Sequence, residues 1–104
     1  MNQQKSVLTL LVALLCCVFS IKAQNAGQVT GKVVDTMGEL SGVSIVVKGS
    51  TNGTVTDLDG QFTLSNVKSS DVLVFSFIGY KTQEIKIGNK KVFNVTLVED
   101  AQAL

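Results

Sequence analysis

Hydrophobic and polar residues alternate with a period of two along most of the chain from residue 29 onward. This period places successive side chains on opposite faces of an extended strand. Stretches rich in Gly, Asn, Asp and Ser separate the alternating segments. The pattern predicts seven strands, at residues 29–35, 43–48, 54–56, 61–65, 72–78, 81–87 and 92–98. Many short strands with frequent turn signals are typical of an all-β, antiparallel β-sandwich, which is the fold class we predict.

The clearest turn signals surround a short β-branched segment. Asn52-Gly53 and Asp59-Gly60 tolerate a positive φ, so we expect a tight turn at each dipeptide. Residues 54–56 between them are all β-branched, which favours an extended backbone. In the first strand, Gly31 interrupts the alternation and indicates a bulge or a close approach of another backbone.

Residues 72–78 are apolar on both faces of the predicted strand. We therefore expect a central strand, or one that a neighbouring domain covers. A helix is the alternative, and it is disfavoured because the run is short, β-branched and bounded by turn signals. One face would carry Leu73, Phe75 and Phe77, and the other Val72, Val74 and Ile78. The inward positions predicted on the other strands are Val29, Gly31, Val33, Val43, Ile45, Val47, Phe62, Leu64, Gln83, Ile85, Ile87, Phe93, Val95 and Leu97.

The N-terminus has the pattern of a cleavable signal peptide. Lys5 precedes an almost wholly apolar run at residues 7–19, and Ala23 is a small residue at which cleavage is expected. A membrane anchor is the alternative, but the run falls short of the ~20 apolar residues that a spanning helix needs. A lipid-modified cysteine is disfavoured, because no small residue directly precedes Cys16 or Cys17.

Removal of residues 1–23 changes the composition of the chain. From Gln24 onward there is no Cys, His, Trp, Pro or Arg, and seven lysines face eight acidic residues. Without a basic stripe, nucleic acid is not an expected partner. Ser-His and Cys-His catalysis and a zinc site built on His both need residues that are absent. The composition thus predicts one small domain with no catalytic residue, metal or cofactor.

Asp57 and Asp59 are the most suggestive pair of charged residues. Their spacing before Gly60 resembles half of a calcium loop, but residues 61–71 lack the late Glu that such a loop needs. Paired glycosidase carboxylates would have to face each other across a cleft, whereas a tight turn exposes them to solvent. We therefore interpret the pair as a turn held by side-chain-to-backbone hydrogen bonds.

Tyr80 follows Gly79 at a break in the alternation and has two interpretations. In the structural one, its ring caps the edge of the sandwich and its hydroxyl bonds to a backbone group. In the functional one, it belongs to a surface that meets another domain or a partner, and the doubly apolar residues 72–78 favour some covering surface.

Four segments together resemble the carboxypeptidase-regulatory-like domain, in the version found at the N-terminus of SusC/RagA-type TonB-linked outer-membrane proteins of Bacteroidetes. They are residues 31–35, 42–50, 53–62 and 73–80. The resemblance covers about residues 29–98, although the loop at residues 38–42 lacks the Pro that family members usually carry. The family-motif positions, to which we assign structural roles, are Gly31, Asp35, Gly42, Gly49, Gly53, Thr56, Asp57, Asp59, Gly60, Phe62, Gly79 and Tyr80.

The resemblance implies a seven-stranded, transthyretin-like or Ig-like β-sandwich at residues 24–98. Residues 99–104 would begin a linker toward a TonB-contacting segment, with a plug and a β-barrel after it. It implies a non-catalytic domain on the periplasmic side of the outer membrane, within a TonB-dependent glycan or peptide transporter. TonB, the plug and barrel, and a SusD-like lipoprotein are the implied partners. A free-standing or truncated periplasmic β-sandwich with a structural or adhesive role is the alternative.

Overall fold

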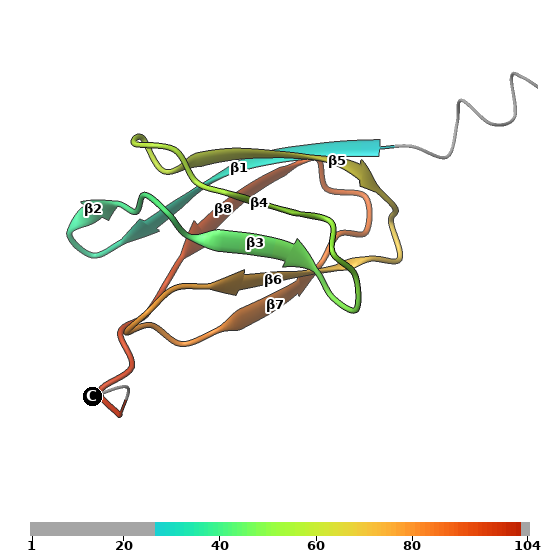
Figure 1. Cartoon of the computed structure of the whole chain (residues 1–104). Coiled ribbons are helices and arrows are strands. Elements are labelled where there is room, and N and C mark those ends of the chain that lie inside the picture. Colours follow the sequence, from blue (N-terminus) through green and yellow to red (C-terminus); the bar gives the residue numbers. More distant parts are fainter. Residues whose placement is uncertain (1–26, 103–104) are drawn as a thin grey trace, which may run out of the picture.

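Two β-sheets face each other across one layer of apolar side chains in the computed structural model of the chain, which describes residues 27–102 (Figure 1). All regular structure in this range is β, and no helix in it is long and apolar enough to cross a membrane. The eight strands are β1 (Gly27–Asp35), β2 (Gly38–Glu39), β3 (Ser44–Val47), β4 (Gly53–Val55), β5 (Gln61–Val67), β6 (Val72–Ser76), β7 (Gln83–Lys86) and β8 (Val92–Thr96). The predicted signal peptide and Ala23 lie outside the described residues.

The first and longest strand, β1, organises one sheet, because it pairs with β2, β5 and β8. Its pairings with β2 and β5 are antiparallel, whereas its pairing with β8 is parallel. The second sheet runs β4-β3-β6-β7 and is antiparallel throughout. The predicted β-sandwich is confirmed, with the two-residue β2 as an eighth strand and the β1–β8 pair as the exception to the antiparallel order.

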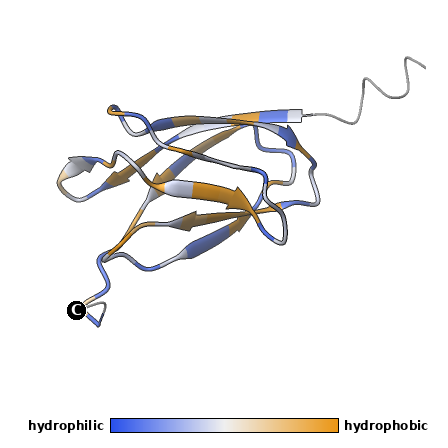
Figure 2. Cartoon of the chain, viewed as in Figure 1, coloured by the Kyte–Doolittle hydropathy of each residue, from blue (hydrophilic) through white to orange (hydrophobic). Residues whose placement is uncertain are grey.

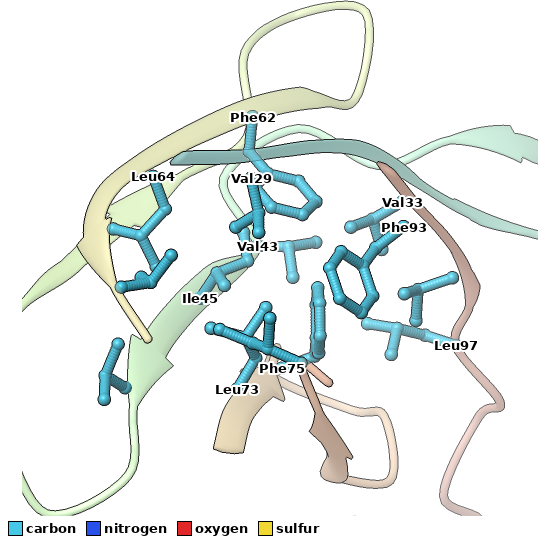
Figure 3. Close-up of a cluster of buried hydrophobic side chains, with 14 residues drawn as sticks. Val29, Val33, Val43, Ile45, Phe62, Leu64, Leu73, Phe75, Phe93 and Leu97 are labelled. Atoms are coloured by element: carbon cyan, nitrogen blue, oxygen red, sulfur yellow. The ribbon is translucent and has the colours of Figure 1, made fainter. Parts of the chain in front are cut away.

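The core lies between the sheets and consists of the side chains that alternation points inward (Figure 3). Hydropathy colouring shows the apolar stretches of β3 and β6 beside the more polar β7 (Figure 2). No buried side-chain nitrogen or oxygen atom within residues 27–102 lacks a hydrogen-bond partner. The described core therefore buries its one polar side chain, Thr56, without an unmet hydrogen bond. The buried apolar residues are Val29, Val33, Val43, Ile45, Val47, Phe62, Leu64, Val67, Leu73, Phe75, Ile87, Phe93, Val95 and Leu97.

The prediction of a tight turn at Asn52-Gly53 is wrong. The turn precedes it, because the Ser50 amide bonds to the Val47 carbonyl and the Val47 amide bonds to the Asn52 carbonyl, so that Gly53 already begins β4. A Cβ at Gly53 would lie 2.9 Å from Val46 Cγ2, so packing against β3 accounts for the glycine.

Most strand ends differ from the prediction by one to two residues, and at β5 and β6 the difference changes the interpretation. Strand β5 continues past Ser65 to Val67. Asn66, with a φ of 59°, is the extra residue of a β-bulge, because Gln28 pairs with Ser65 and Gly27 with Val67. Strand β6 is central, as predicted, but it ends at Ser76. Ile78 therefore lies in the following turn, where it is 95% exposed, and not on the outer face of the strand.

Candidate functional site

Asp57 uses its carboxylate to hold the turn between β4 and β5. Its Oδ1 accepts hydrogen bonds from the amides of Asp59 and Gln61, both at 2.9 Å. Its backbone carbonyl also accepts the Gly60 amide at 3.0 Å. Both acidic side chains of this turn are exposed. Within residues 27–102, no group of three or more His, Cys, Asp or Glu side chains could hold a metal ion.

Thr56, which is 3% exposed, is the one polar side chain buried in the described core. Its hydroxyl accepts a hydrogen bond from the Val43 amide at 2.9 Å and donates one to the Leu40 carbonyl at 2.6 Å. Its own amide bonds to the Val43 carbonyl, and its carbonyl accepts the Gly42 amide. Thr56 thus joins the segment before β3 to the point where the chain crosses from one sheet to the other.

At Gly31 and Gly60, neighbouring atoms leave no room for a side chain. A Cβ at Gly31 would lie 2.1 Å from the Phe93 carbonyl oxygen and 2.6 Å from the Phe62 ring. Gly60 has a φ of +76°, and a Cβ there would lie 2.6 Å from the Val33 carbonyl oxygen. The expected close backbone approach at Gly31 is confirmed. Phe62, over Gly31, also packs edge-to-face against Phe75, with ring centroids 5.7 Å apart.

The other motif glycines divide between the two ends of the sandwich. Gly42 and Gly79 lie in turns at the end where β1 and β6 finish, together with the turn that contains Asp57. Gly49 lies in the turn at the opposite end, between β3 and β4. The fold therefore brings together most, but not all, of the motif positions.

Asp35 and Tyr80 form a hydrogen-bonded pair across the end of the sandwich. The Tyr80 hydroxyl donates to Asp35 Oδ2, while Asp35 Oδ1 accepts the amides of Met37 at 2.8 Å and Gly38 at 3.1 Å. The Tyr80 ring packs against Phe77, with centroids 5.7 Å apart. The prediction of a backbone partner for the Tyr80 hydroxyl is thus wrong, because the hydroxyl bonds to the carboxylate of the last residue of β1.

Each residue of the pair shifts the pKa of the other in the direction that preserves the hydrogen bond. Donation from the Tyr80 hydroxyl, followed by donation from the Met37 amide, lowers the pKa of Asp35 below its ordinary value. The bond to Asp35, with burial and the negative charge as further causes, raises the pKa of Tyr80 from 10.0 to about 12. Asp35 is therefore ionised and Tyr80 protonated over the whole neutral range.

Sequence reasoning assigned Asp35 and Tyr80 to the motif but did not pair them. They are separated by 45 residues, and no periodicity links a turn after the first strand to a turn after the sixth. The sequence does mark both positions as turn sites, because Asp35 directly precedes a turn and Tyr80 directly follows a glycine. Such a signal indicates local turns only, and the contact between the turns depends on the topology of both sheets.

The geometry defines a β-sandwich domain in which motif side chains bond to turns and to one another. Residues 29–104 match the model of the CarboxypepD_reg-like domain, and the chain belongs to this family. The resemblance noted in the sequence is thereby confirmed.

Related receptors extend far beyond the length of this chain. It is 41% identical over 101 residues to a TonB-dependent receptor of Formosa agariphila, in a match that covers 95% of this chain and 10% of the relative. It is 40% identical over 107 residues to the TonB-dependent receptor SusC of Bacteroides thetaiotaomicron, with 100% and 10% covered. The chain thus spans about a tenth of the length of these curated relatives.

Solved structures with a similar backbone come from a cohesin–X-dockerin complex of Acetivibrio cellulolyticus. One chain matches with a TM-score of 0.62 and 18% identity, over 75% of this chain and 61% of that chain. A second, from another interface mutant of the complex, gives a TM-score of 0.54 at 20% identity over 67% and 52%. At this level of identity the likeness shows the fold alone.

Proposed function

We propose that this chain is the N-terminal, periplasmic domain of a TonB-dependent outer-membrane transporter for glycans or peptides, and that it acts by protein–protein contact. The observation that carries the proposal is the similarity of almost the whole chain to a tenth of each TonB-dependent receptor, SusC included. TonB, the plug and barrel of the same receptor, and a SusD-like lipoprotein are the proposed partners.

The chemistry of the described residues supports recognition as the function. Asp57 is engaged by backbone amides, and Asp35 by Tyr80 and two amides, so neither carboxylate is positioned toward a substrate cleft. A nucleophile would also need an activating base, and residues 24–104 contain neither His nor Cys. We assign the motif residues, from Gly31 to Tyr80, the role of holding the sandwich and its turns in place.

Export places the domain where this function needs it. Residues 1–23 act as the signal peptide in this proposal, with cleavage after Ala23, followed by the sandwich and by a linker that starts at residue 99. Asp100 still donates its amide to the Gly79 carbonyl at 2.9 Å, so the first residues of that linker remain attached to the sandwich.

An in-frame deletion tests the accessory role. Removal of residues 27–98 from the chromosomal gene is expected to leave the receptor in the outer membrane and to slow growth on the glycans or peptides that it imports. The matched control carries Thr63→Ala, a change on the exposed face of β5. Growth of the deletion strain at the wild-type rate on every such nutrient, with normal receptor levels, would reject the proposal.

The alternative is a free-standing periplasmic sandwich with a structural or adhesive role. Its support is the single apolar core within residues 27–102, to which both sheets contribute. The two candidates differ in the size and location of the mature protein, and cell fractionation separates them.

A further inference from the structure

Four turns and segments meet at the end of the sandwich from which the chain leaves, and we call them the exit end. They are residues 35–39, 57–60, 77–80 and 98–102. Neighbouring segments contact one another. Gly60 lies against Glu39 and Leu40, and the Tyr80 hydroxyl bonds to Asp35. The Gly79 carbonyl accepts the Asp100 amide. Figure 1 shows the segment that follows β8 at this end and the start of β1 at the opposite one.

Exposed apolar side chains concentrate at the exit end. Met37 is 90% exposed, Leu58 88% and Ile78 95%, and each comes from a different turn. Val98 adds a fourth, at 55%. Single exposed apolar residues are ordinary, but four of the six large apolar residues exposed in the described chain lie at this end, and such a concentration is typical of interaction surfaces. Beside Ile78, the half-buried Phe77 helps to line a shallow hollow on the second sheet.

The charge of the described residues is divided between the two ends. The exit end and its immediate surroundings carry two lysines, Lys32 and Lys81, against six acidic residues, Asp35, Glu39, Asp57, Asp59, Glu99 and Asp100. The opposite half carries two acidic residues, Asp71 and Glu84, against five lysines, Lys48, Lys68, Lys86, Lys90 and Lys91. A partner of the exit end should therefore be basic and partly apolar.

We propose that the exit end docks onto a basic, partly apolar surface of the same receptor, formed by the polypeptide that follows residue 104. The inference rests on the proposed function, and it adds the face of the domain and the chemistry of its partner. The chain leaves the sandwich at the end that carries these exposed apolar residues, because Glu99 forms an antiparallel β-bridge with Tyr80 and the Asp100 amide bonds to the Gly79 carbonyl. Covalent linkage at this position gives the following polypeptide a high effective concentration, so a modest contact area suffices.

Photo-cross-linking in living cells tests the docking. The photoreactive residue benzoylphenylalanine replaces Ile78 in the chromosomal gene, and in a matched strain it replaces Asn89, an exposed turn residue at the opposite end. After irradiation, mass spectrometry should find position 78 joined to peptides of the same chain beyond residue 104 that contain Lys or Arg. Position 89 should give several-fold fewer such links.

Charge reversal supplies the second readout. Asp59→Lys combined with Glu99→Lys should lower the intrachain link from position 78 several-fold, whereas Lys90→Glu at the opposite end should leave it unchanged. Links from position 78 to a second copy, to another protein or to lipid, or a yield no higher than at position 89, would overturn the inference. The gel mass of the uncross-linked chain separates the two failures: a long chain without the link refutes only the docking, whereas a chain of domain size refutes the proposed function as well.

Discussion

At the scale of single residues, the stability of this domain depends on polar groups that reach across turns. Thr56 is buried among apolar side chains, and its hydroxyl satisfies the Val43 amide and the Leu40 carbonyl together. A buried backbone amide without a hydrogen-bond partner lowers the free energy of unfolding. The Thr56 hydroxyl should therefore contribute more to stability than its methyl group.

Replacement of Thr56 tests this ranking. Thr56→Val keeps the shape of the side chain but leaves the Val43 amide unpaired, and it should lower the free energy of unfolding by about 1–3 kcal/mol. Thr56→Ser keeps the hydroxyl and should cost less. Urea unfolding of residues 24–104, followed by circular dichroism, measures both. Equal losses in the two variants would mean that the hydrogen bonds do not dominate.

The Asp35–Tyr80 pair makes a spectroscopic prediction. Tyr80 is the one tyrosine of the chain, so phenolate absorbance reports its ionisation directly. The wild-type midpoint should lie at about 12, and Asp35→Asn should bring it back toward 10.0, because the bond to Asp35 is the largest cause of the raised pKa. Glu99→Gln, which removes the smallest cause, should change it little. An unchanged midpoint in Asp35→Asn would contradict the pairing.

The same pair predicts how stability depends on pH. Tyr80 has a higher pKa in the folded state than in the unfolded state, so its contribution is complete below pH 10.0 and is lost as the pH rises toward about 12. Asp35 has a lowered pKa, so its contribution is lost as the pH falls through the acidic range below 3.8. Tyr80→Phe should therefore have a lower urea midpoint than the wild type at neutral pH, and the difference should vanish near the alkaline limit. A difference that persists there would count against the linkage.

At the scale of elements, β1 holds the first sheet together, because three strands pair with it. Residues 30–32 of β1 pair with both β5 and β8, and at Gly31 a backbone oxygen and a ring occupy the place of a side chain. The packing of Phe62 and the position of β8 thus depend on the same glycine.

Gly31→Ala should consequently weaken the whole sheet. The added Cβ would force β8 and the Phe62 ring to move, at a cost toward the upper end of the roughly 1–3 kcal/mol typical of overpacked cores. Hydrogen exchange should accelerate at the amides of Phe93 and Val95. The control Thr30→Ala lies next to it on the exposed face and should change stability by less than about 1 kcal/mol. If both variants proved equally stable, the close approach would be of no consequence.

The alternation of the sequence predicted which side chains face the core, because the period of two is a local property of each strand. It therefore assigned Val29, Ile45 and Phe75 correctly to the interior. It could not predict the parallel pairing of β1 with β8, because the two strands lie at opposite ends of the domain sequence.

For the candidate site, the sequence located the turns better than their contacts. It interpreted Asp57 correctly as a turn residue, because the bonds concerned span two and four residues. It misplaced the turn at Asn52-Gly53, where packing against Val46 selects glycine for its small size. The partner of Tyr80 lies 45 residues away, beyond any local pattern.

At the scale of the whole molecule, the two ends of the sandwich differ in charge and in exposed apolar residues. The acidic exit end carries Met37, Leu58 and Ile78 on three turns and releases the chain beside them. This polarity is the basis for the contact face that we propose. It agrees with the proposed role as one domain of a receptor like the relatives, of whose length the chain spans about a tenth.

The most direct test of the central claim is the size and location of the mature protein. Cells are separated into soluble periplasm and outer membrane, and both fractions are probed with an antibody raised against residues 27–102. A module of a TonB-dependent receptor predicts one band in the outer-membrane fraction, roughly ten times the mass of this chain, as in the relatives. A band of the size of the domain alone, in the soluble periplasm, would contradict the claim.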